Sequence, residues 1–396
     1  MTGHGLSGDE PVPLPGANRV QGGDAVAQMV TILGAGAMGT ALATPLRERG
    51  HEVRVWGTWL DDDLLDAVEA GRNLRTDVPV PAGTMLYRAE ELSAALDGAG
   101  WLIIAVASAG VEAVARRVCQ TRFDLATAQG VLLSSKGFSR ESDGSVHLLT
   151  DSVRSVAAEH GLGVVPLVAV GGPCMANEVA AGRPTAATFA SVERKWADLA
   201  ATLMGTAVYR PSVSQDEVGL EVAAALKNVY AIALGFADGL SQSEPNQLPY
   251  HNLRSAIFSR ATEEMAFIAQ ELGGQPATVY GLPGVGDLEV TGVAGRNAIF
   301  GRRIGGGETA GEALSAMKAT GQVVEGVPAT HLAMVLIEQR LPAHADRLPL
   351  LQAIAAVVDE RAEPYSALVG AALSATVPGA VKPKTAMFTH PPMPSE

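Results

Sequence analysis

Short apolar stretches alternate with helix-like stretches over the first half of the chain. Residues 29–33 form an apolar, β-branched run that stops at Gly34, which predicts a buried strand. Residues 40–49 carry apolar side chains at helical spacing as far as Gly50, which predicts a helix with a glycine cap. The same alternation continues with apolar runs at 52–56, 101–107, 130–134 and 167–170 and with helix-like segments at 110–120 and 144–159. It predicts a parallel sheet with helices on both faces.

The pattern changes after Pro211. Ala- and Leu-rich helical spacing then runs from about Asp216 to Ala375, and the glycine-rich residues 281–287 and 305–307 are expected to form loops within it. We therefore expect an α/β domain followed by an all-α domain. The expected segments are a flexible head at 1–28, the sheet domain at 29–215, the helical domain at 216–376 and a loose tail at 377–396.

Composition narrows the class of protein. With 396 residues, 47% of them hydrophobic and 18% charged, the chain has the material for two packed domains. Its two cysteines, Cys119 and Cys174, cannot form a disulfide framework, and neither they nor the eight histidines show metal-ligand spacing. We expect a cytoplasmic protein without a metal. No stretch is typical of a membrane span, and the head lacks the pattern of a secretory signal.

The charge balance limits the partners. The formal net charge of −13 disfavours binding to nucleic acid or to an anionic membrane over most of the surface. An anionic ligand would therefore need a local cationic site.

A glycine motif joins the first predicted strand to the first predicted helix. Gly34 allows a tight turn, Gly36 allows close approach of a pyrophosphate, and Gly39 allows the helix to pack on the strand. This context predicts binding of a dinucleotide. The second strand is followed by residues 56–59, which include neither an acid for a ribose hydroxyl nor an arginine for a 2′-phosphate; the first acid is Asp61. The choice between NAD and NADP stays open.

Three charged residues are candidates for chemistry. Lys227 is the only charged side chain between Val222 and Ala237, and burial lowers a lysine pKa toward neutrality, although a lysine at a helix edge can also extend its amine to solvent. Asp287, in the glycine-rich stretch 281–288, could pair with a lysine. Lys136 follows a predicted strand, where ligands of open α/β sheets collect.

Arg296 and Asn297 offer a forked cation and an amide for a phosphate. The alternative is an ordinary solvated basic face that Arg296 shares with Arg302 and Arg303.

Taken together, these motifs resemble the NAD(P)-dependent glycerol-3-phosphate dehydrogenases over about residues 29–340. The resemblance rests on Gly34-Ala35-Gly36-Ala37-Met38-Gly39-Thr40-Ala41-Leu42-Ala43, Ser135-Lys136-Gly137, Gly172-Pro173 through Glu178-Val179-Ala180, Ala225-Leu226-Lys227-Asn228-Val229, Gly284-Val285-Gly286-Asp287-Leu288, Arg296-Asn297 and Val323-Val324-Glu325-Gly326-Val327. It implies a Rossmann domain, a helical domain, a substrate held between them, and reversible hydride transfer between the nicotinamide and carbon 2 of dihydroxyacetone phosphate.

The resemblance also implies residue roles. Lys227 falls on the general acid/base, with Asp287 beside it. The substrate-binding positions are Lys136, Gly172, Cys174, Gly295, Arg296 and Asn297. The cofactor-binding positions are Gly34, Gly36, Ala37, Met38, Gly39, Lys136, Ala176, Arg296, Val323 and Glu325. Asn252 and Arg260 fall on a helix expected to back the site.

Two departures from the family pattern concern the substrate. Cys174 and Gly295 each stand where a hydroxyl side chain is usual. They leave open a paralogue that reduces another small phosphorylated or phosphonylated ketone. An alternative from another class is a dinucleotide-binding sensor without turnover. The apolar helical domain makes a homodimer plausible.

Overall fold

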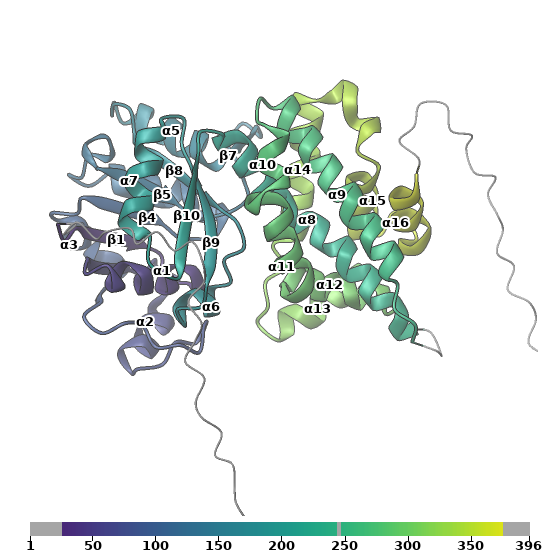
Figure 1. Cartoon of the computed structure of the whole chain (residues 1–396), viewed down its shortest axis with the longest axis horizontal. Coiled ribbons are helices and arrows are strands. Elements are labelled where there is room, and N and C mark those ends of the chain that lie inside the picture. The colour runs from purple at the N-terminus through teal and green to yellow at the C-terminus, as the bar shows by residue number, and fades with distance from the viewer. Residues whose placement is uncertain (1–25, 244–246, 375–396) are drawn as a thin grey trace, which may run out of the picture.

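The computed structural model describes residues 26–243 and 247–374. They form a sheet-containing domain and a helical domain that lie side by side (Figure 1). Residues 1–25 of the expected flexible head, and all of the expected tail at 377–396, lie outside the described residues.

The first domain contains an eight-stranded sheet in the order β10-β9-β8-β5-β4-β1-β2-β3. Its strands are β1 (Met29–Leu33), β2 (Glu52–Trp56), β3 (Met85–Tyr87), β4 (Trp101–Ile104), β5 (Gly130–Leu133), β8 (Leu167–Gly171), β9 (Thr185–Ala190) and β10 (Tyr209–Ser214). The six strands from β3 to β8 in this order pair in parallel, as the alternating pattern predicts.

The far edge of the sheet corrects the expectation of a purely parallel sheet. Strand β9 runs antiparallel to β8, and β10 then runs parallel to β9. The connection from β8 to β9 contains only the five-residue helix α6 (Ala176–Ala180), which is too short for a crossover, so the chain returns beside the strand that it has just left. Helix α7 (Arg194–Met204) makes the crossover to β10.

Helices cover both faces of this sheet, as predicted. Val30 and Ile32 of β1 pack in the core under α1 (Ala37–Glu48) and α7, whereas Leu33 packs in the core on the opposite face. That opposite core is covered by α3 (Leu92–Leu96), α4 (Val111–Cys119) and α5 (Leu149–Glu159). Helix α2 (Asp62–Glu69) follows β2.

One helix boundary differs from the prediction. The helix expected at 144–159 begins only at Leu149. The residues before it form β7 (Val146–Leu148), which pairs antiparallel with β6 (Phe138–Arg140). The pairing with β6 takes up backbone groups that a longer helix would need.

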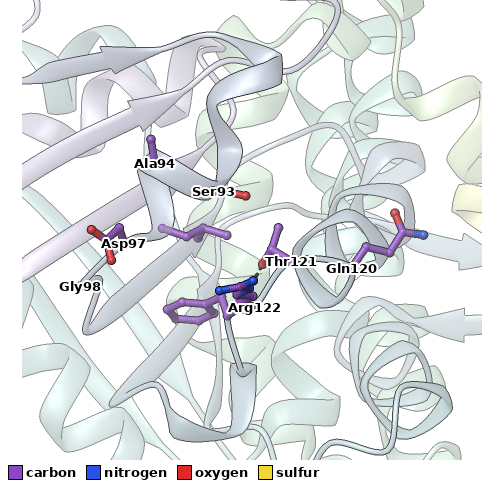
Figure 2. A pocket seen from close by; sticks show the side chains of 9 residues that line it. Ser93, Ala94, Asp97, Gly98, Gln120, Thr121 and Arg122 are labelled. Carbon is purple, nitrogen blue, oxygen red and sulfur yellow. Dashed lines mark hydrogen bonds between the residues drawn. The ribbon is translucent and has the colours of Figure 1, made fainter.

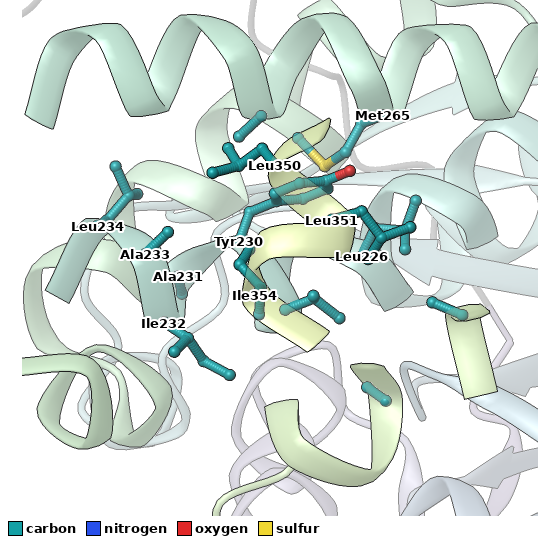
Figure 3. Close-up of a cluster of buried hydrophobic side chains, with 14 of the residues drawn as sticks. Leu226, Tyr230, Ala231, Ile232, Ala233, Leu234, Met265, Leu350, Leu351 and Ile354 are labelled. Atoms are coloured by element: carbon teal, nitrogen blue, oxygen red, sulfur yellow. The ribbon is translucent and has the colours of Figure 1, made fainter. Parts of the chain in front are cut away.

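The second domain is helical, as predicted, and is built around α8 (Glu217–Leu240). Its other helices are α9 (His251–Glu271), α10 (Pro276–Tyr280), α11 (Asp287–Ala294), α12 (Arg296–Gly305), α13 (Ala310–Ala319), α14 (Gly326–Arg340), α15 (Pro349–Val358) and α16 (Pro364–Leu373). Tyr230 of α8 lies among Leu226, Met265 and Leu350 in this core (Figure 3). Helix α8 is long and apolar enough to cross a membrane, but its apolar window is entirely buried within the fold.

The glycine-rich residues 281–287 do not form the expected loop. Residues Leu282–Gly286 make a single π-helical turn that runs directly into α11. The loop expected at 305–307 is also shorter, because Gly305 still belongs to α12 and the chain leaves the helix through Gly307, whose φ is +104°.

Helices α8 and α12 touch through glycines. A Cβ on Gly235 of α8 would overlap the carbonyl of Ala298, and a Cβ on Gly301 of α12 would overlap the carbonyl of Ile232. Gly239 of α8 and Gly305 of α12 make equally close approaches to the facing helix, so the two backbones lie closer together than side chains would allow. This packing fixes the start of α12 against the middle of α8, where Lys227 stands.

Candidate active site

The glycine turn after β1 leaves space for a ligand. Gly34 has a φ of +121°, and a Cβ there would lie 2.7 Å from the carbonyl oxygen of Ala105. Gly39 packs against Gly34, whereas nothing lies within 4 Å of a Cβ placed on Gly36. Gly36 is the N-cap of α1 and supplies no side-chain cap, so the first N–H groups of the helix face that space. These features fit the pyrophosphate of a dinucleotide.

Other predicted cofactor positions surround this turn. Ala37 and Met38 form the first turn of α1, and Ala176 begins α6, which packs on α1. Asp61 also reaches the turn: its Oδ2 accepts hydrogen bonds from the N–H of Ala35 at 3.3 Å and from the N–H of Thr58 at 2.8 Å. The sequence placed this acid several residues beyond β2, yet its side chain folds back to brace the glycine turn.

A buried carboxylate bridges the two predicted lysines. Lys227 Nζ donates to Asp287 Oδ1 at 2.7 Å, and Lys136 Nζ donates to Asp287 Oδ2 at 2.5 Å. Lys136 comes from the loop after β5, Lys227 from the middle of α8, and Asp287 from the first residue of α11, so the site joins the two domains. Lys136 also donates to the carbonyl oxygen of Gly172 at 2.9 Å.

The pKa values of the two lysines are shifted in opposite directions. Burial lowers the pKa of Lys227, and the nearby charge of Lys136 lowers it further against the opposing effect of Asp287. Burial acts on Lys136 in the same direction, but the carboxylate of Asp287 outweighs it and raises the pKa of Lys136. For Asp287, burial opposes ionisation, but the two lysines prevail and lower its pKa. The cluster therefore favours an ionised Asp287, a charged Lys136 and a Lys227 that releases its proton more readily.

Sequence reasoning missed a fourth member of the cluster. Thr291 Oγ1 accepts a hydrogen bond from Lys227 Nζ at 2.9 Å. Thr291 stands four residues after Asp287 on α11, and this spacing places both side chains on one face of a helix. Had residues 281–287 been recognised as helical, the spacing would have indicated the contact.

The predicted phosphate ligands begin α12 at the rim of the cluster. Arg296 is half-exposed, and its Nη2 donates to Glu325 Oε1 at 3.0 Å. Asn297 is buried: its Nδ2 donates to Asn228 Oδ1 at 3.0 Å, and its Oδ1 accepts from the N–H of Gly326 at 2.8 Å. These bonds tie the start of α12 to the neighbour of Lys227 and to the segment that holds Glu325. Val323 of that segment is exposed.

The remaining predicted positions differ in what they contribute. Gly172 has a φ of +110° and presents its carbonyl to Lys136. Cys174 lies close enough to Lys136 and Asp287 for their charges to act on its thiol, whose pKa burial raises. Gly295 joins α11 to α12, and a Cβ there would overlap the carbonyl of Thr291. The junction between the two helices is therefore too tight for the hydroxyl side chain that is usual at this position.

Asn252 and Arg260 on α9, which were expected to back the site, lie near the end of the described chain. Arg260 donates to Glu263 and to the carbonyl of Ser374, and Asn252 is exposed next to a hollow lined by Tyr365 and Val369. Their helix does pack on α8, but Arg260 bonds to Ser374 at the end of the described chain and Asn252 faces that hollow.

A separate surface hollow lies at the amino ends of the central strands of the sheet. It is lined by residues 93–94, 96–98 and 120–123 (Figure 2). These segments lead into the amino ends of β4 and β5, whereas open α/β sheets bind ligands beyond the carboxyl ends of their strands. Among the described residues, no group of three His, Cys, Asp or Glu side chains could hold a metal ion.

Comparison with known proteins identifies the family. The model of the NAD-dependent glycerol-3-phosphate dehydrogenase N-terminus matches residues 29–197, and the model of the C-terminus of the same enzymes matches residues 216–369. The chain belongs to this family. The resemblance found in the motifs is thus confirmed, and the family consists of oxidoreductases that use NAD(P).

Relatives match over most of the chain. An NADP(+)-dependent glycerol-3-phosphate dehydrogenase from Archaeoglobus fulgidus is 36% identical over 300 residues, which cover 75% of this chain and 86% of the relative. A glycerol-3-phosphate dehydrogenase [NAD(P)+] from Stenotrophomonas maltophilia is 32% identical over 345 residues, 86% of this chain and 94% of the relative. The crystal structure of glycerol-3-phosphate dehydrogenase from Coxiella burnetii superposes with a TM-score of 0.74 at 30% identity, covering 86% of this chain and 98% of that one.

Proposed function

We propose that this enzyme reduces dihydroxyacetone phosphate to sn-glycerol 3-phosphate, reversibly, with Lys227 as the general acid/base. The observation that carries the proposal is the arrangement of Lys227, Lys136 and Asp287, in which the ammonium groups of a buried and a partly buried lysine share one buried carboxylate. Such a pair favours release of one proton. Because Lys136 is the more strongly held cation, the proton that moves is that of Lys227.

The residues divide the reaction between them. The nicotinamide cofactor supplies the hydride when it is bound. Lys227 donates a proton from Nζ to the carbonyl oxygen during reduction and takes it back in the reverse direction. Thr291 holds Nζ in place, and Asp287 keeps the lysine oriented. The charge left on the cluster favours an anionic substrate on a protein whose net charge is −13.

Arg296 and Asn297 are the proposed phosphate ligands. The side chain of Arg296 is half-exposed at the rim of the cluster, where an incoming phosphate can displace Glu325 from it. The charged fork of an arginine suits a phosphate. The cofactor positions complete the assignment: they are Gly34, Gly36, Ala37, Met38, Gly39, Lys136, Ala176, Arg296, Val323 and Glu325.

The proposal also covers the oligomeric state and the cellular location of the enzyme. Apolar side chains of the helical domain are exposed at Tyr280 and Val293, which suits contact with a second copy of the chain. We therefore propose a homodimer. The two free cysteines, Cys119 and Cys174, suit a reducing compartment and support a cytoplasmic location. Light scattering coupled to size-exclusion chromatography tests the dimer, since a monomer at micromolar concentration would contradict it.

The direct test mixes purified protein with dihydroxyacetone phosphate and either NADH or NADPH and follows cofactor oxidation. Rapid oxidation of one cofactor is expected, and it also settles the preference that the turn around Asp61 leaves open. A panel of other small phosphorylated and phosphonylated ketones serves as the comparison, because Cys174 replaces a usual hydroxyl. Faster turnover of another ketone would contradict the assigned substrate, and binding of cofactor without turnover of any ketone would contradict catalysis.

A further inference from the structure

A second buried polar cluster, which the proposed reaction does not use, joins the two domains at the start of α8. Glu217 and Glu221 stand four residues apart on α8, and both carboxyl groups reach the hydroxyl of Thr150 in the first turn of α5. Glu217 Oε1 lies 3.0 Å from Thr150 Oγ1, and Glu221 Oε2 lies 2.5 Å from the same atom. Both glutamates are buried.

The donors around these two carboxyl groups are too few for two anions. Arg154 of α5 donates to both oxygens of Glu217, at 2.7 Å and 2.9 Å, and so balances its charge. The N–H of Thr150 donates to Glu221 Oε1 at 3.2 Å. The hydroxyl of Thr150 has one hydrogen and can donate to only one of the two carboxyl groups that it touches. The other contact is a hydrogen bond only if that carboxyl group is itself protonated.

Glu221 is the group whose surroundings require the proton. Its charged neighbours on α8 and α5 are Glu217 and Asp151, which are acidic, and Arg154, which is engaged by Glu217. Glu221 and Lys136 line one small cavity, but the ammonium of Lys136 pairs with Asp287. The rest of the lining is apolar apart from Ser135, whose hydroxyl donates to the carbonyl of Val106. Burial raises the pKa of Glu221 to about 8, and the charges of Glu217 and Asp151 act in the same direction.

We infer that Glu221 carries a proton and clamps the helix that bears Lys227 to the sheet domain. The hydrogen bonds then run in one direction: Glu221 donates to Thr150 Oγ1, and Thr150 donates to the ionised Glu217. Glu221 also accepts the N–H of Thr150, which the N-cap residue Leu148 cannot satisfy with its side chain. A residue of one domain thus caps a helix of the other, six positions before Lys227.

Glutamine gives the matched test, because its amide places a donor and an acceptor where the protonated acid has them. The thermal midpoints of the wild type, Glu221→Gln and Glu217→Gln are measured from pH 5.5 to 9. The thermal midpoint of Glu221→Gln minus that of the wild type is expected to increase with pH up to about pH 8 and to stay constant above it. The folded wild type retains a proton that its unfolded chain releases above the ordinary glutamate pKa, so its stability falls over this range.

Glu217→Gln is the control within the cluster. It removes the charge that Arg154 balances, so its midpoint should lie below that of the wild type at every pH. A gap between Glu221→Gln and the wild type that does not change with pH would overturn the inference. So would a Glu221→Gln variant that is damaged as much as Glu217→Gln or does not fold, since an amide replaces the protonated acid without loss of a bond.

A kinetic measurement tests whether the clamp reaches the site, and this part rests on the proposed function. At pH 9 Glu221→Gln should retain a larger fraction of its neutral-pH kcat than the wild type, because only the wild type loses the clamping proton. Equal fractions would show that the clamp does not position Lys227. Absence of turnover in the wild type would instead count against the proposed function, while the thermal midpoints still decide the protonation of Glu221.

Discussion

Lys136 and Lys227 approach the same carboxylate from different domains, and they differ in their second partners and in the direction of their pKa shifts. Lys136 donates to the carbonyl oxygen of Gly172, a group that can only accept, so this contact always uses a hydrogen of the lysine. Lys227 contacts the hydroxyl of Thr291, which can rotate and donate to a neutral amine. The loop after β5 thus holds a fixed cation, whereas the middle of α8 holds a lysine that can exchange a proton. Burial lowers the pKa of Lys227, whereas at Lys136 the charge of Asp287 outweighs burial, and the second partner of each lysine fits the protonation that results.

Removal of the exchanging lysine should have the largest effect. Lys227→Ala is expected to lower kcat by about 1000-fold, since general acid catalysis contributes about 100-fold to 10,000-fold. Cofactor affinity, measured by fluorescence titration, should change little because the glycine turn lies in the other domain. The exposed Lys195→Ala serves as the control and should keep the wild-type kcat. A Lys227→Ala variant with near-normal kcat would remove Lys227 from the mechanism.

Removal of the carboxylate that the two lysines share should destabilise the folded protein. Asp287→Asn leaves two buried cations without their anion, and we expect it to lower the free energy of unfolding at pH 7 by about 3 kcal/mol. The pKa of Asp287 is lowered in the folded protein, so its stabilising effect is present above its unfolded value near 3.8 and is lost as pH falls through the folded value. Urea unfolding at pH 7 and at pH 4 measures the effect. A loss that is larger at pH 4 would contradict the ionised state assigned to Asp287.

Replacement of the rim cation should act on binding rather than on chemistry. Arg296→Ala is expected to raise the KM for the phosphorylated ketone about tenfold and to change kcat less, because a charged hydrogen bond contributes about 1.5–3 kcal/mol and Glu325 already engages this arginine. Arg303→Ala, on the same helix and paired with Glu308, should leave KM unchanged. Steady-state kinetics decide, and equal KM values for both variants would remove Arg296 from the phosphate site.

The smallest expected effect comes from removing the hydroxyl of Thr291, the second partner of Lys227. Thr291→Val removes the hydroxyl that can donate to a neutral Lys227, and we expect kcat to fall about fivefold, the size of one ordinary hydrogen bond. Thr291→Ser keeps the hydroxyl and should restore most of the rate. If valine and serine gave the same kcat, the hydroxyl would have no part in the difference between the two lysines.

Local features of this site were predictable from sequence. The glycine turn joins adjacent elements, so strand, turn and helix could be recognised together. The motif around Lys227 and the pairing of Asp287 with a lysine were also expected. Thr291 was missed because residues 281–287 were taken for a loop, which hid its helical spacing from Asp287.

Features that depend on distant segments were not predictable. Lys136 is 151 residues from Asp287, and no local pattern indicates that one carboxylate serves both lysines. The contact of Arg296 with Glu325 and the return of Asp61 to the glycine turn also depend on the tertiary structure. The antiparallel β9 follows from the short connection through α6, whose length the hydrophobic pattern did not define.

The pH dependence of kcat in the wild type and in Lys136→Met tests the central claim most directly. Methionine fills a similar space without charge, so Lys227 loses a neighbouring cation and becomes the only lysine paired with Asp287. The pKa of Lys227 should therefore rise, and the fall of the reduction rate on the alkaline side should move to higher pH while turnover persists. A Lys136→Met variant as inactive as Lys227→Ala, or one with an unmoved alkaline fall, would contradict the assignment of Lys227 as the residue that exchanges the proton.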